Sequence, residues 1–110
     1  KINIKTIHIF LKNGFKFLRK TRFIMSRYFT NLDDRQIVDT PITLELVKKV
    51  KKELEENGNK DPEMAHLTED QLYLKFIKDI ANNKLSYTDT IIIAKELETF
   101  NNIYFARWYA

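Results

Sequence analysis

Apolar side chains between residues 67 and 80 recur every third or fourth position, which is the spacing of one face of an α-helix. Leu72, Phe76 and Ile80 stand four residues apart, and Tyr73 and Ile77 lie beside them on a helical projection. One side of this helix is therefore broadly apolar and needs other elements to cover it. The pattern predicts the central helix of a folded core.

The start of this helix is predicted at Thr68. A Thr hydroxyl at the N-cap accepts a hydrogen bond from an amide of the first turn, and Gln71 can bond back to the amide of Thr68. Leu67 before the cap and Leu72 inside the helix can then make a hydrophobic contact around it. These signals predict a helix over residues 69–82.

A second helix is predicted over residues 41–57. Thr40 can cap it, and Pro41 suits the first helical position because proline has no N–H to leave unbonded there. The buried stripe of this helix is expected to consist of Leu46, Val47, Val50 and Leu54. We expect Gly58 to end the helix in the left-handed conformation and Pro62 to prevent the helix from resuming.

A third helix is predicted over residues 87–99, with Ser86 as its cap and Asp89 favourably placed in the first turn. Asn101 and Asn102 interrupt the chain, and a short aromatic helix is expected after them. Residues 26–39 combine apolar anchors with turn-forming Asn and Asp, and this mixture predicts a loop or one helical turn.

These elements predict an all-α fold, a small single-domain helical bundle of three main helices plus a short C-terminal helix. A chain of 110 residues suits one domain, and only two glycines and two prolines disfavour a β fold rich in turns. The core is expected to contain Leu46, Val50, Leu54, Leu72, Phe76, Ile80, Ile91, Leu97 and Trp108.

Cysteine is absent, which excludes disulfides, thiolate nucleophiles and Cys-ligated zinc. A chain without cysteine is compatible with a reducing compartment, and we expect a cytoplasmic location. No apolar run approaches the ~18 residues of a membrane-spanning helix.

The net charge of +4 is an average over two unlike parts of the chain. Residues 1–24 contain seven basic side chains and no acidic one, whereas residues 25–110 carry 12 basic and 15 acidic side chains. The basic character therefore belongs to the N-terminal part alone. We divide the chain into a basic N-terminal extension, residues 1–24, and a helical domain, residues 25–110.

Residues 1–24 have three alternative interpretations. The first methionine, Met25, stands where the composition changes, so the extension could be foreign to the native fold. Placed on a helix, its apolar residues share one face; they are Ile4, Ile7, Leu11, Phe15 and Leu18. Such a helix could pack on the domain or a partner, or its basic side could bind nucleic acid or an anionic membrane. A chain starting at Met25 is expected to fold as well as the whole sequence.

The basic run between Lys48 and Lys52 resembles a nucleic-acid patch at first sight. However, Glu residues stand four positions from Lys49, Lys51 and Lys52, where they can neutralise them. This arrangement predicts an ordinary solvated helix face.

Catalytic signals are missing from the sequence. It contains no glycine-rich phosphate loop, no nucleophile elbow and no spacing of metal ligands. Asp33, Asp34 and Asp39 have no organised ligand spacing, and His66 is a lone histidine in a polar connection. We therefore expect no enzyme activity, no cofactor, no metal and no small-molecule substrate.

The last eleven residues contain five aromatic side chains. On a short helix Phe100, Tyr104 and Trp108 would align, so this segment could form a lid that closes the core. Alternatively it binds a partner, because Trp, Tyr and Arg are frequent anchors of protein interfaces. The predicted partner-binding residues are Tyr104, Arg107, Trp108 and Tyr109.

The predicted function is therefore that of a small non-catalytic accessory protein. It would bind another protein, or form a homo-oligomer, through the aromatic C-terminal segment. The alternative is a protein that binds nucleic acid or an anionic membrane through residues 1–24.

Overall fold

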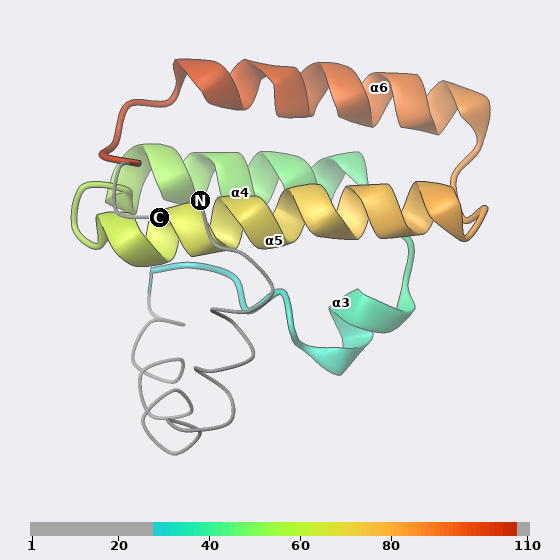
Figure 1. The fold of residues 1–110 in the computed structure, drawn as a ribbon, viewed down its shortest axis with the longest axis horizontal. Coiled ribbons are helices and arrows are strands. Elements are labelled where there is room, and N and C mark those ends of the chain that lie inside the picture. Colours follow the sequence, from blue (N-terminus) through green and yellow to red (C-terminus); the bar gives the residue numbers. More distant parts are fainter. Residues whose placement is uncertain (1–27, 108–110) are drawn as a thin grey trace.

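Three long helices, α4 (Leu44–Asn57), α5 (Pro62–Ala81) and α6 (Tyr87–Glu98), make up most of residues 28–107, the part of the chain described by this computed structural model. A short helix, α3 (Arg35–Asp39), precedes them, and a 3₁₀ helix, η1 (Thr99–Asn102), follows. Both α5 and α6 run antiparallel to the element before them, and α4 packs against both (Figure 1). No strand occurs within these residues, so the predicted all-α class is confirmed.

Helix α4 begins at Leu44, and the predicted start at residue 41 is therefore wrong. Thr43 caps the helix, because its hydroxyl accepts a hydrogen bond from the amide of Leu46 at 3.1 Å. The amide of Ile42 donates instead to the carboxylate of Asp79 on α5, at 2.7 Å. This contact with another helix holds the chain before Thr43 outside the helical conformation.

Helix α5 begins at Pro62, so the predicted capping box at Thr68 is wrong. Asp61 is the N-cap and accepts a hydrogen bond from the amide of Met64 at 3.3 Å. Pro62 occupies the first turn, where its missing N–H is tolerated, so it begins a new helix after the break that ends α4. Thr68 is buried inside the helix.

Helix α6 agrees with the prediction. The hydroxyl of Ser86 accepts a hydrogen bond from the amide of Asp89 at 3.0 Å, and Glu98 is the last residue. Between α5 and α6, Asn83 has a φ of 61°, the left-handed conformation that Asn tolerates better than most residues. This turn reverses the chain.

Gly58 ends α4 in the right-handed conformation, with φ at −55°, so the expected left-handed cap is wrong. The space around the residue explains the glycine instead. A Cβ atom there would lie 2.5 Å from the carbonyl oxygen of Leu54 and 3.0 Å from Cβ of Phe105. A side chain at residue 58 would therefore displace the C-terminal part of the chain.

The core contains side chains from all three long helices and from the segments before and after them. Among the predicted core residues Val50, Leu54, Leu72 and Leu97 are buried, and Leu46 and Phe76 are partly buried. Ile80 and Ile91 are exposed, which contradicts the prediction, and Trp108 lies outside the described residues. The core also takes Phe29, Leu32, Ile42, Phe100, Ile103 and Phe105 from segments outside the three long helices.

Candidate interaction site at the C-terminal segment

The C-terminal segment, residues 99–107, is built on buried aromatic and aliphatic side chains. Phe100, Ile103 and Phe105 are all buried, and the ring centroids of Phe100 and Tyr73 on α5 lie 6.1 Å apart. The chain leaves the helical conformation at Ile103, where ψ is 127°. Residues 103–107 therefore follow the surface of the bundle in an irregular conformation.

Tyr104 is 89% exposed although its neighbours in sequence are buried. A continuous helix would have placed Tyr104 on the same face as Phe100, but η1 ends at Asn102 and the two side chains enter different environments. An aromatic ring that is this exposed gains nothing from the core. It is available to another molecule.

Arg107 fastens the end of this segment to α5. Its Nε atom donates to Oε1 of Glu69 at 2.9 Å and one terminal nitrogen donates to Oε2 at 3.0 Å, a bidentate pair. The guanidinium also donates to the carbonyl oxygens of Ile103 and Phe100, and it lies 4.0 Å from the ring centroid of Phe105. The side chain of Glu69 is only 5% exposed, so Arg107 neutralises a buried charge.

The Arg107→Ala variant is expected to lose about 2–3 kcal/mol of unfolding free energy, because Glu69 would lose its charged partner and the segment two bonds to its own backbone. Urea denaturation of the full chain measures the loss. Arg107→Lys should recover part of it, since lysine keeps the charge but lacks the bidentate fork. An unchanged urea midpoint for Arg107→Ala would contradict this account.

Tyr73 lies beside this ion pair. Burial raises the pKa of the Tyr73 phenol to about 12, and the carboxylates of Glu69 and Asp70 also raise it, while Arg107 lowers it. The phenol is therefore neutral at physiological pH. It adds no negative charge to the surroundings of Glu69.

The four predicted partner-binding residues differ in exposure and in their contacts within the chain. Tyr104 is exposed, whereas the guanidinium of Arg107 bonds within the chain, so Arg107 positions the segment. Trp108 and Tyr109 lie outside the described residues. Whether these four residues bind a partner stays a prediction.

The buried charges were missed by the sequence reasoning. The expected core contained only apolar side chains, whereas Glu69, Lys75 and Asp79 are all buried. In the structure Lys75 donates to the carbonyl oxygen of Thr40 at 2.8 Å and lies 3.2 Å from the carboxylate of Asp79. One signal was available, because these charged residues share the helical face of Leu72.

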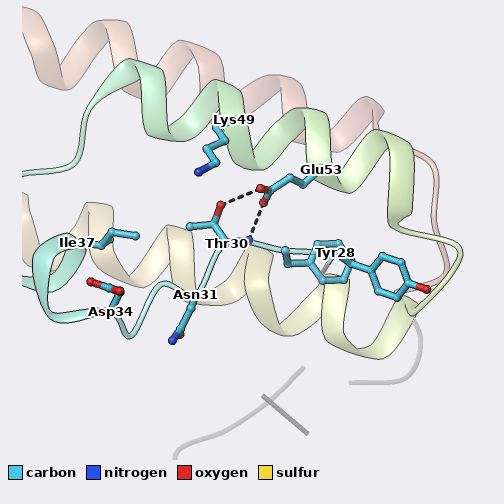
Figure 2. A pocket seen from close by; sticks show the side chains of 8 residues that line it. Tyr28, Thr30, Asn31, Asp34, Ile37, Lys49 and Glu53 are labelled. Carbon is cyan, nitrogen blue, oxygen red and sulfur yellow. Dashed lines mark hydrogen bonds between the residues drawn. The ribbon is translucent and has the colours of Figure 1, made fainter. Parts of the chain in front are cut away.

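A second feature is a pocket of about 300 Å³ between α4 and the start of the described chain (Figure 2). The amide and the hydroxyl of Thr30 each donate to the carboxylate of Glu53 at 2.8 Å. The charge spacing predicted that Glu53 would pair with Lys49. In the structure Glu53 bonds Thr30 instead. Lys51, likewise, bonds Glu96 of α6 at 3.4 Å. The pocket is open, and the bonds between Thr30 and Glu53 hold the chain to α4 there.

His66 is mostly buried, and its Nε2 atom lies 3.7 Å from the carboxylate of Asp70. Among residues 28–107, no three His, Asp or Glu side chains gather closely enough to hold a metal ion. In the same part of the chain, no helix has the length and apolar character needed to cross a membrane.

The apolar stripe proposed for residues 1–24 lies outside the described residues, so all three interpretations of that segment remain predictions. Comparison with protein families, with curated proteins and with solved structures found no match.

Proposed function

We propose that this chain is a small non-catalytic accessory protein that binds another protein through its C-terminal segment. The observation that supports this most directly is Tyr104, which is 89% exposed on a segment whose other aromatic and aliphatic side chains, Phe100, Ile103 and Phe105, are buried. Tyrosine is enriched among the residues that dominate protein interfaces, because its ring combines apolar area with a hydrogen-bonding hydroxyl.

The anchoring of the segment strengthens this proposal. Ile103 and Phe105 are buried on either side of Tyr104. Arg107, three residues after Tyr104, bonds Glu69 of α5. A backbone held at several points loses little conformational freedom when a partner binds. The energy of the Tyr104 contact is then available for affinity.

Trp108 and Tyr109 directly follow the Arg107 anchor in sequence. We include them in the proposed contact surface because Trp and Tyr are typical interface anchors. We also propose a cytoplasmic location, which the absence of cysteine supports.

The Tyr104→Ala variant is expected to lose its partner while the fold stays intact. The full chain and its variants would be expressed with a photo-crosslinking tag in the cells that make this protein, and captured proteins would be quantified by mass spectrometry. The matched control is Tyr87→Ala, because Tyr87 is also exposed, at 83%, but lies at the opposite end of α6. A partner captured by Tyr87→Ala but lost, by about tenfold or more, with Tyr104→Ala supports the proposal.

If Tyr104→Ala and Tyr87→Ala captured equal amounts of the partner, the proposal that Tyr104 binds this partner would be contradicted. If capture instead requires residues 1–24, and the captured material is nucleic acid or anionic lipid released by salt, the alternative function is favoured. Circular dichroism of each variant confirms that a loss of capture does not come from unfolding.

A further inference from the structure

Helix α4 ends on an asparagine, Asn57, that stands directly before a glycine. Asparagine is a thermolabile residue, and glycine after it removes the side chain that would hinder its reaction. A base in the solvent takes the amide proton of Gly58, and that nitrogen attacks Cγ of Asn57. The N–Cγ bond forms, the Cγ–Nδ2 bond breaks, and ammonia leaves with a proton from water. Water then opens the cyclic imide, which gives aspartate or isoaspartate.

The packing of the bundle requires this glycine. A Cβ atom at residue 58 would clash with the carbonyl oxygen of Leu54 and press on the side chain of Phe105. A larger residue, which would slow the reaction, does not fit there. The reactive pair is therefore a consequence of how the end of α4 packs against the C-terminal segment.

We infer that Asn57 is a deamidation site and that the folded structure protects it. The N–H of Gly58 donates to the carbonyl oxygen of Leu54 at 2.8 Å, so the proton that a base must remove is bonded within the chain. Gly58 is also buried, which keeps the base away.

The side chain of Asn57 is held as well. Its Nδ2 atom donates to the carbonyl oxygen of Tyr28 at 3.3 Å, and its backbone belongs to α4. The five-membered ring of the imide needs a ψ angle far from the helical value. Asn57 must therefore leave the helix and release Tyr28 before it can react.

Conversion would loosen the stretch that starts the described chain. Aspartate has no N–H to donate, so a carboxylate at residue 57 would face the carbonyl oxygen of Tyr28, and it would add negative charge at the C-terminal end of a helix. The remaining contacts of this stretch are the bonds from Thr30 to Glu53 and the ammonium group of Lys60, which lies 5.7 Å from the ring centroid of Tyr28.

The first test follows the conversion of Asn57 by peptide mapping and mass spectrometry. The full chain is incubated in mildly alkaline buffer, with and without urea above the unfolding midpoint. Conversion should be slower by about tenfold or more without urea, because it waits for local opening of the chain. A peptide of residues 53–60, too short for a stable helix, corrects for the effect of urea on the reaction. Asn13 also precedes a glycine and should react as fast as Asn57 in the unfolded chain.

The second test compares Asn57→Asp with Asn59→Asp in the full chain. Both variants add one negative charge near the end of α4, but Asn59 is exposed in the following turn. Asn57→Asp should lower the urea midpoint, because the bond to Tyr28 is lost. Asn59→Asp should unfold close to the wild-type midpoint.

Equal rates at Asn57 in the folded and unfolded chain, after the peptide correction, would overturn the inference, because the fold would then give no protection. An unfolded chain that reacts at Asn13 but not at Asn57 would overturn it too. Equal urea midpoints for the two aspartate variants would disprove the effect of conversion on Tyr28. The wild-type rates need no variant, so they decide even if Asn57→Asp does not fold.

Discussion

Replacing Lys75 by methionine is expected to lower the unfolding free energy by about 3–5 kcal/mol. Lys75 and Asp79 are among the few charged side chains in the described chain that are buried, with 9% and 5% of the side chain exposed. The ammonium group bonds Thr40 and Asp79, and Asp79 in turn accepts the amide hydrogen of Ile42. Methionine keeps most of the volume but leaves the carboxylate of Asp79 buried beside no cation.

The measurement is urea denaturation of the full chain. Lys78→Met is the matched control, because Lys78 lies on the same helix but is exposed, and its replacement should change the unfolding free energy by less than about 0.5 kcal/mol. The double variant Lys75→Met, Asp79→Leu should recover part of the loss, since no buried charge remains. Recovery should stay incomplete, because Thr40 and Ile42 lose their partners. Equal midpoints for Lys75→Met and Lys78→Met would refute this role.

The second large effect is expected from Phe100→Ala, which should also cost about 3–5 kcal/mol. Phe100 is 0% exposed, it lies in η1, and its ring contacts Tyr73 on α5. Removing the ring leaves a cavity where α5 meets the C-terminal segment. Since the carbonyl oxygen of Phe100 also accepts from Arg107, the loss should loosen the anchor of the segment as well.

Tyr104→Ala, four residues away, is the control for Phe100→Ala, because Tyr104 is almost fully exposed. It should change the unfolding free energy by less than about 0.5 kcal/mol. Phe76→Ala should fall between the two, since Phe76 is only partly buried. Similar losses for Phe100→Ala and Tyr104→Ala would mean that the segment is helical and that both rings pack alike, as the aromatic spacing alone predicted.

Partner capture is also expected to respond to the Phe100→Ala variant. A Phe100→Ala variant that still folds should present Tyr104 on a less rigid segment, so partner capture should fall with it.

The candidate site was only partly visible in the sequence. The concentration of aromatic residues after Phe100 indicated a special segment, and the exposure of Tyr104 is consistent with that prediction. The role of Arg107 could not be predicted, because its partner Glu69 lies 38 residues earlier in the chain. Residue type alone did not distinguish an arginine that bonds a buried carboxylate from one that awaits a partner.

Local patterns by themselves determined the helical class and the limits of α6. Apolar periodicity and the Ser86 cap depend on residues within one or two turns of each other, and those interactions form in any surroundings. Only the tertiary structure decided where α4 begins, which charges are buried, and that Ile80 stays exposed. The bonds responsible join residues 35 to 38 positions apart, Lys75 to Thr40, Ile42 to Asp79 and Arg107 to Glu69. Such bonds form only after the helices have packed, because packing removes water from the groups and brings distant partners together.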